Sequence, residues 1–401
     1  MTGASSSQIH LPLGFSFSAV PAGIKASGRP DLALVECAPG TTAAALFTKN
    51  RVVAAPVEVD RKFLAKSHGH VRAVIVNSGN ANCATGQPGI RNCERVCFEV
   101  ARILKTRPEE IFPSSTGIIG VPLPTEKIVA KLGELISARA ASGAAVLELA
   151  SAIMTTDTRP KIASARFQTN DGSVNLLGVA KGSGMIHPNL ATMLVYAFSD
   201  VSAKAADLKR LLRNACGETF NCMSVDGDTS TNDTVLLMAS GESGADLSQC
   251  EKRFGQALLE VCGSLCEQIV SDGEGIQHVV QLGIEQAKSR TEAVQVARTI
   301  AHSLLVKTAW AGADPNWGRI LAAVGRSGIP VDPAKINIFI GEQNVCQRGL
   351  SVVFDAEKAH AEMSKPAYAI RVQLGRGKAA IKYLTTDLTA EYVRINADYS
   401  T

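Results

Sequence analysis

Short apolar runs alternate with long polar loops along this chain, and this alternation limits the possible folds more than any other feature. In the first half, strand-like composition marks residues 31–37, 43–47, 71–76, 163–168, 174–180 and 192–198. Helical spacing marks 91–105, 126–138 and 144–154, and later 204–216, 250–270 and 291–307. More strands are expected at 234–238, 336–340, 369–374 and 379–383. Because strands are followed by helices in both halves, the sequence predicts mixed α/β layers.

Three polar segments, rich in Gly, Ser and Asn, are predicted to be loops: 77–86, 114–120 and 181–191. The third loop ends directly on the predicted strand 192–198. At 401 residues the chain can hold two or three domains and bury a core without disulfides or metals.

Charge and hydropathy exclude several classes of protein. The 41 Lys and Arg residues and 37 Asp and Glu residues are scattered, which argues against a nucleic-acid partner. No apolar run approaches the roughly 18 residues of a membrane-spanning helix. The first basic residue is Lys25, so the start lacks the charge pattern of a secretory or transit segment, and we expect a cytoplasmic protein.

The ten cysteines contain no Cys-x2-Cys pair. Cys93 and Cys97, like Cys262 and Cys266, are four residues apart in segments predicted to be helical, so each pair is expected on one buried face. We therefore predict core thiols and no metal site.

The common catalytic templates are absent from the sequence. It contains no phosphate-binding loop, dinucleotide fingerprint, zinc-protease motif or Gly-x-Ser-x-Gly elbow, and its seven histidines suggest no triad.

The junction at Thr192 suggests another chemistry. A threonine hydroxyl becomes nucleophilic when a base takes its proton, and the free α-amine of a chain's first residue, with a pKa of about 8, can be that base. Attack of the Thr192 hydroxyl on the Ala191 carbonyl would give an ester that water opens, and Thr192 would then begin a new chain. Composition alone favours the simpler interpretation, that Thr192 is a strand-opening residue with high β propensity.

Several longer sequence motifs, called strings below, distinguish between Thr192 as a nucleophile and Thr192 as a strand-opening residue. They are Asn77–Asn82, Ser114–Gly120, Met154–Thr158, Lys181–Met185 with Ala191–Leu194, Ser224–Thr234, Asp272–Gly275, Asp314–Ile320 and Ile395–Tyr399. With these strings the chain resembles, almost end to end, the ornithine acetyltransferase family of arginine biosynthesis. The resemblance implies an α/β fold, a layered α-β-β-α sandwich of the self-processing ornithine acetyltransferase and aminopeptidase type, with a smaller C-terminal α/β portion from about residue 285.

The resemblance also implies self-cleavage between Ala191 and Thr192. An alpha chain of residues 1–191 and a beta chain of residues 192–401 would stay together, and two such pairs would associate. Thr192 would take the acetyl group of N-acetylornithine, release ornithine and pass the acetyl group to glutamate, with no cofactor.

Residue roles follow from the matching strings. The Thr116 hydroxyl and the Gly117 backbone N–H are expected to form the oxyanion hole. Substrate contacts are expected at Thr155, Lys181, Thr192, Glu274, Asn396 and Thr401. In our interpretation Lys181 pairs with the substrate α-carboxylate, and Glu274 faces the δ-ammonium of ornithine.

Some alternatives stay open. Acetyl-CoA could also be a donor, an amide hydrolase could use the same nucleophile with water as acceptor, and a non-catalytic amino-acid binder would never mature. Ile276-Gln277-His278 departs from the family's usual Ala-Thr-Lys, beside Glu274. We interpret Asp226, Asp228 and Asp233 as parts of a hydrogen-bonded structural loop, because the string lacks the calcium-loop pattern.

Overall fold

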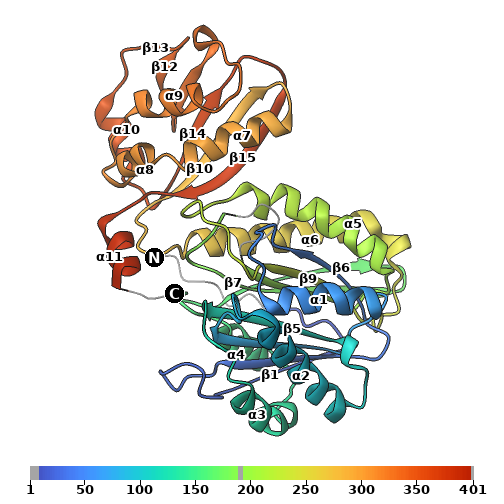
Figure 1. Cartoon of the computed structure of the whole chain (residues 1–401). Helices are drawn as coiled ribbons and strands as arrows, with labels where there is room; N and C mark the ends of the chain where they lie inside the picture. Colours follow the sequence, from blue (N-terminus) through green and yellow to red (C-terminus); the bar gives the residue numbers. More distant parts are fainter. Residues whose placement is uncertain (1–8, 188–192, 399–401) are drawn as a thin grey trace.

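The computed structural model describes residues 9–187 and 193–398 and contains three β-sheets with helices packed around them (Figure 1). The four-stranded sheet has the order β1 (Phe15–Val20), β2 (Leu32–Cys37), β4 (Ala73–Asn80), β5 (Ile111–Ile118). The five-stranded sheet has the order β3 (Thr42–Phe47), β9 (Thr234–Ala239), β8 (Leu194–Ser199), β7 (Gly172–Lys181), β6 (Lys161–Thr169).

These two sheets face each other and are covered by helices on their outer sides. Strand β8 shows the reason, because its six residues are all buried. Leu194, Tyr196 and Phe198 belong to the core shared with the four-stranded sheet, whereas Val195 and Ala197 belong to the core under the helices. Successive side chains of a strand point to opposite faces, so a continuous apolar run fits a strand covered on both faces.

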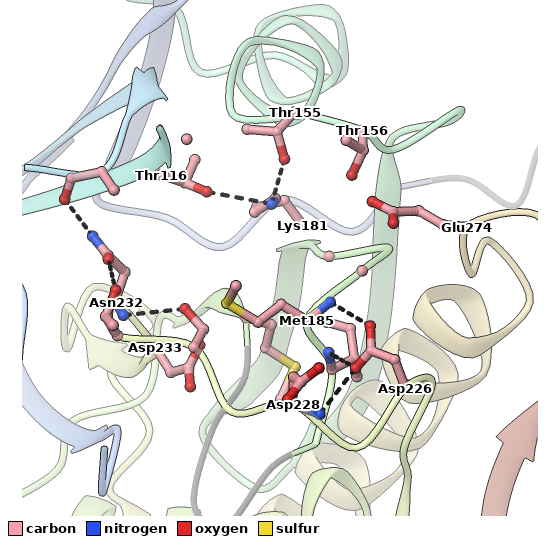
Figure 2. A pocket seen from close by; sticks show the side chains of 18 of the residues that line it. Thr116, Thr155, Thr156, Lys181, Met185, Asp226, Asp228, Asn232, Asp233 and Glu274 are labelled. Carbon is pink, nitrogen blue, oxygen red and sulfur yellow. Dashed lines mark hydrogen bonds between the residues drawn. The ribbon is translucent and has the colours of Figure 1, made fainter. Parts of the chain in front are cut away.

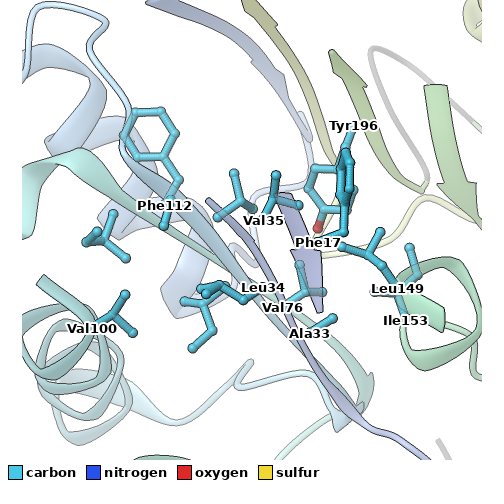
Figure 3. Packing of buried hydrophobic residues seen from close by; sticks show 14 of the residues in the cluster. Phe17, Ala33, Leu34, Val35, Val76, Val100, Phe112, Leu149, Ile153 and Tyr196 are labelled. Atoms are coloured by element: carbon cyan, nitrogen blue, oxygen red, sulfur yellow. The ribbon is translucent and has the colours of Figure 1, made fainter. Parts of the chain in front are cut away.

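The core between the two sheets is held by aromatic contacts. Phe198 makes edge-to-face contacts with Phe15 and Phe17 of β1, with ring centroids 5.3 Å apart in both pairs. Figure 3 shows Phe17 beside Tyr196, with Leu149 and Ile153 next to them. Each fully buried aromatic or aliphatic side chain contributes about 1.5–3 kcal/mol, so this layer fixes how β1 and β8 face each other.

The helices complete the sandwich. Those that pack with the four-stranded sheet are α1 (Ala55–Lys66), α2 (Gly86–Leu104), α3 (Thr125–Ser137) and α4 (Gly143–Ala152), and those that pack on the five-stranded sheet are α5 (Ala205–Glu218) and α6 (Leu247–Val270). The predicted core thiols are confirmed: Cys93, Cys97, Cys262 and Cys266 are buried, and burial raises the pKa of the Cys262 thiol to about 12.

A smaller C-terminal lobe has its own core and lies beyond the sandwich in Figure 1. Its sheet has the order β13 (Leu350–Ser351), β12 (Gln343–Gln347), β11 (Asn337–Ile340), β14 (Ala367–Gln373), β10 (Val279–Ala287), β15 (Ala379–Thr386). Its helices are α7 (Arg290–Ala301), α8 (Leu304–Ala311), α9 (Trp317–Gly325) and α10 (Ala356–Met363). A last helix, α11 (Ala390–Asp398), returns to the side of the sandwich (Figure 1). The predicted α/β sandwich with a C-terminal α/β portion is therefore confirmed.

Some local predictions were wrong. Residues 114–118 are not a loop but part of β5, which pairs in parallel with β4 from Ala73↔Ile111 onward. Residues 77–80, also predicted as loop, extend β4. The single helix expected at 291–307 is two helices, broken at His302 and Ser303. No helix among the described residues has the length and apolarity needed to cross a membrane.

Candidate active site

A pocket opens where β5 and β7 end and β8 and β9 begin. Besides these strands, the turn after α6 and one face of α11 contribute to its wall. Six residues singled out in the sequence line it together: Thr116, Gly117, Thr155, Lys181, Glu274 and Asn396. The fold therefore brings residues from both halves of the chain to one place.

Lys181, the last residue of β7, is held by two hydroxyl groups. Its Nζ donates to Thr155 Oγ1 at 2.7 Å and to Thr116 Oγ1 at 3.3 Å, and Figure 2 shows the ammonium group between these two threonines. An ammonium group has three N–H donors, so one donor remains for a ligand. Its nearest anionic partner, Asp157 Oδ2, is 3.8 Å away.

Behind Lys181 lies a fully buried ion-pair network. Lys161 Nζ is 2.7 Å from Asp157 Oδ1 and 2.6 Å from Asp272 Oδ2. Burial alone would raise the pKa of Asp157, but the charges of Lys181 and Lys161 and the N–H of Gly182 outweigh it and hold the pKa well below its usual value. Asp157 is therefore charged, and it anchors the end of β7 through the Gly182 N–H at 2.6 Å.

The predicted oxyanion residues lie at the end of β5. Gly117 has φ +133°, and a Cβ there would collide with the backbone of Gly79 and Asn80 on β4. Only glycine permits this close approach, which places its backbone at the pocket wall. Thr116 accepts a hydrogen bond from Lys181, so the hydrogen of its own hydroxyl is free to point at a ligand.

Asn232 holds this end of β5 in place. Its Nδ2 donates to the carbonyl oxygens of Ala81 at 2.6 Å and Ser115 at 2.9 Å, and its Oδ1 accepts from the Thr231 hydroxyl at 2.6 Å. No pattern in the sequence predicted a positioning role for Asn232, although residues 224–234 match the family. Ala81 and Ser115 are more than 100 residues away from Asn232 in the sequence, so only the fold reveals these contacts.

Glu274 lies in the turn after α6, with its carboxylate directed at the pocket. Its Oε2 accepts from Asn396 Nδ2 of α11 at 2.9 Å, and its backbone N–H donates to the Ser183 carbonyl at 3.3 Å. A side chain on Gly184 would displace this carboxylate from its present position. No Lys or Arg of the described residues forms an ion pair with Glu274, which leaves its charge available for a cationic ligand.

The acidic string at 224–234 is partly structural, as predicted. Asp226 accepts from the backbone N–H groups of Met185 at 2.6 Å, Ile186 at 2.9 Å and Asp228 at 3.1 Å (Figure 2). Burial raises its pKa, and these N–H groups only partly offset that rise. Within the described ranges, no group of three or more His, Cys, Asp or Glu residues could hold a metal ion. Asp228 and Asp233 also line the pocket, which the sequence did not predict.

Residues 276–278, which differ from the usual family sequence, do not line the pocket. His278 Nδ1 lies 3.0 Å from Asp387 Oδ2, and the Gln277 N–H donates to Asp387 Oδ1 at 3.1 Å. The His278 ring also makes an edge contact with Tyr368. These contacts tie the segment after Glu274 to the C-terminal lobe.

Three predicted residues, Ala191, Thr192 and Thr401, lie outside the described residues. Met193, which is covalently bonded to Thr192, lines the pocket. Thr192 is therefore one peptide unit from a pocket residue.

Comparison with known proteins identifies relatives over nearly the whole chain. The sequence model of the ArgJ family matches residues 16–401. An arginine biosynthesis bifunctional protein ArgJ from Methylococcus capsulatus is 44% identical over 97% of this chain and 95% of its own length. One of the same name from Pseudomonas fluorescens is 40% identical over 98% of both chains. A crystal structure of ornithine acetyltransferase complexed with ornithine, from Mycobacterium tuberculosis, also matches. The aligned residues are 40% identical and include 45% of this chain and 94% of the crystallised chain, with a TM-score of 0.42.

Proposed function

This chain belongs to the ArgJ family, and from that premise we propose that it moves the acetyl group of N2-acetylornithine to glutamate through an acetyl-Thr192 intermediate. It is an acyltransferase of arginine biosynthesis that yields ornithine and N-acetylglutamate. The observation that carries the proposal is that six residues from distant strings line one pocket directly beside Met193. The cut before Thr192, giving chains 1–191 and 192–401, is part of the proposal.

In the first half-reaction the Thr192 hydroxyl attacks the acetyl carbonyl. The hydroxyl proton passes to the α-amine of Thr192, and then to the leaving nitrogen as the C–N bond of the amide breaks and ornithine departs. In the second half-reaction the amine of glutamate attacks the acetyl ester, and Thr192 regains its proton. Each step thus returns the nucleophile to its starting form.

Thr116 and Gly117 stabilise the negative oxygen in both half-reactions. Because Lys181 Nζ donates to Thr116 Oγ1 at 3.3 Å, it polarises this hydroxyl and makes it a stronger donor toward the oxyanion. Each oxyanion donor is worth about 3–4 kcal/mol of transition-state stabilisation.

Two charged side chains select the substrate. The remaining N–H of Lys181 pairs with the α-carboxylate, and Glu274, held by Asn396 at 2.9 Å, pairs with the δ-ammonium of ornithine. Thr155 positions Lys181, and Thr401 completes the set of contacts implied by the family. We expect Glu274→Gln to reduce the preference for acetylornithine over neutral analogues, and an unchanged preference would refute that assignment.

Replacement of the nucleophile tests the proposal. We expect Thr192→Ala to remain a single chain and to lose acetyl exchange, whereas Thr192→Ser keeps a hydroxyl and retains slower cleavage and exchange. Intact-mass measurement detects cleavage, and formation of N-acetylglutamate that requires acetylornithine detects exchange. Normal rates of both in Thr192→Ala would refute the function proposed.

A second activity is favoured by the name of the relatives, which are called bifunctional. We propose that acetyl-CoA also acylates Thr192, so that glutamate is acetylated directly. Formation of N-acetylglutamate from acetyl-CoA without acetylornithine tests this activity separately.

The remaining alternatives differ in products. An amide hydrolase would release ornithine without glutamate-dependent acetylglutamate, and a binding protein would stay whole. An assembly of two alpha and two beta chains, and a cytoplasmic location, remain predictions. Native mass measurement, compared with the masses of the denatured chains, tests the assembly.

A further inference from the structure

Asp233 is a buried acid that the mechanism above does not use. It is 1% exposed, lines the pocket and directly precedes β9. Its Oδ2 atom is shielded from solvent and has no hydrogen-bond partner among the described residues. Buried carboxylate oxygens almost always have partners, so an unpartnered one beside a reaction site calls for a functional explanation.

The strand register places Asp233 next to Met193, the first described residue after the predicted cleavage point. Strands β8 and β9 run parallel with Leu194 paired to Thr234, and the Thr234 N–H donates to the Met193 carbonyl at 3.0 Å. Asp233 is therefore the neighbour of Met193 across the sheet. The Met193 N–H also stabilises the charge of the Asp233 carboxyl group, and Met193 is the residue directly after Thr192 in the chain.

The surroundings of Asp233 leave its negative charge incompletely compensated. Burial raises its pKa well above the usual value, and the Ser230 and Thr48 hydroxyls, the Lys181 charge and the Met193 N–H lower it only in part. The other charged groups lining this pocket are Asp226, Asp228 and Glu274. All three are acids, so Lys181 is the one cationic side chain in the described pocket wall.

We propose that Asp233 is the positioning residue for the α-amino group of Thr192, whose N–H its unpartnered oxygen accepts after cleavage. The inference rests on the proposed function, since the amine exists only once the bond before Thr192 is broken. The amine then directs one N–H at Asp233 and its lone pair at the Thr192 hydroxyl. When the amine takes the hydroxyl proton it becomes an ammonium group, and the carboxylate beside it stabilises the new positive charge.

This role predicts a specific pH dependence. A carboxylate next to an ammonium group raises the pKa of that group, and the acidic limb of the kcat/KM profile reports the pKa of the base in the free enzyme. We expect Asp233→Asn to move the acidic limb of acetylornithine turnover down by about 1 pH unit or more and to lower the maximal rate. A side chain that only supports the fold would lower the rate without moving the limb.

Two further variants make the test decisive. Asp226→Asn is the control, because Asp226 is also an acid of the pocket wall but its oxygens accept three backbone N–H groups. We expect its acidic limb to stay at the wild-type position. Ser230→Ala removes a hydroxyl that stabilises the Asp233 charge, so its limb should move in the same direction as that of Asp233→Asn, by less.

The outcomes separate this inference from the proposed function. If wild type exchanges acetyl groups and both Asp233→Asn and Ser230→Ala keep the wild-type limb, the positioning role is wrong while the function stands. If the Asp233→Asn chain stays uncut, the position of the acidic limb in the kcat/KM profile of Ser230→Ala tests the positioning role instead. If the wild-type chain itself stays whole, both the proposed function and this inference fail.

Discussion

Lys161 and Lys181 approach different oxygens of the same carboxylate, Asp157, from different surroundings. Lys161 is fully buried and makes contacts of 2.7 and 2.6 Å with Asp157 and Asp272. Lys181 keeps 10% of its side chain exposed, lies 3.8 Å from Asp157 and bonds two hydroxyl groups instead.

The difference lies in where each positive charge is neutralised. Two close carboxylates compensate Lys161 completely, so its charge is used to hold the loop after α4 against the end of α6. Neutral hydroxyls bind Lys181 directly, and its carboxylate partner Asp157 is more distant and shared with Lys161, so part of the Lys181 charge stays available for a substrate carboxylate. A structural lysine and a substrate-binding lysine are thus distinguished by their partners and not by their burial alone.

The largest expected effect comes from removing the buried cation. Lys161→Met leaves two carboxylates buried without their partner, and we expect a loss of about 3–5 kcal/mol of unfolding free energy. Urea unfolding measures it. Lys131→Met is the control, because the exposed pair of Lys131 with Glu134 should be worth less than about 1 kcal/mol. Equal stability losses in the two variants would contradict the structural role of Lys161.

Removing the other cation should affect catalysis and leave the fold intact. A hydrogen bond to a charged group is worth about 1.5–3 kcal/mol, so we expect Lys181→Met to lower kcat/KM for acetylornithine by roughly 10- to 150-fold. Steady-state kinetics with matched unfolding curves separates the two effects. An unchanged kcat/KM would show that Lys181 does not bind the substrate.

A smaller effect is expected from the hydroxyl that positions Lys181. Thr155→Val preserves the shape of the side chain but removes the 2.7 Å hydrogen bond to Lys181. The bond involves a charged donor, but Thr116 still holds Lys181 and the ammonium group itself remains, so we expect only part of its value to be lost and kcat/KM to fall by roughly 2- to 10-fold. The adjacent Thr156→Val alters the same pocket without removing a bond to Lys181, and it should have the weaker effect of the two.

The smallest effect concerns pH, because the shared carboxylate titrates far below neutrality. The two lysines hold the folded-state pKa of Asp157 below its unfolded value of about 3.9. Its stabilising contribution is therefore fully present above about pH 4 and is lost as the pH falls toward the folded pKa. We expect no contribution of Asp157 to the pH dependence of unfolding between about pH 5 and 8, and a shallower acid loss in Asp157→Asn. A slope near neutrality that Asp157→Asn abolishes would contradict this.

The family resemblance supplied the layered sandwich, whereas the position of β8 could be predicted from composition for a clear physical reason. A strand covered on both faces is apolar throughout, and the run at 192–198 has that composition. Residues 114–118 could not be recognised as a strand, because Ser114, Ser115 and Gly117 are typical of loops and the pairing of this segment depends on β4, far away in the sequence. Tertiary pairing outweighed local composition there.

The candidate site was predictable in part. The resemblance supplied Lys181, Glu274 and Asn396, which the fold brings to one pocket. The surroundings of Asn232 and Asp233 were not predictable, because they depend on contacts with β5 and β8 rather than on their own neighbours in the chain. Hydrogen bonding between distant segments leaves no periodic signal in a single sequence.

The claim that Thr192 begins a new chain and carries the acetyl group is best tested by intact-mass measurement of the purified protein, denatured before and after mixing with acetylornithine. We expect two fragments, one ending at Ala191 and one beginning at Thr192. Acetylornithine should add the mass of one acetyl group to the second fragment alone, and glutamate should remove it again. A single uncut chain that still exchanges acetyl groups, or an acetyl group on the first fragment, would contradict it.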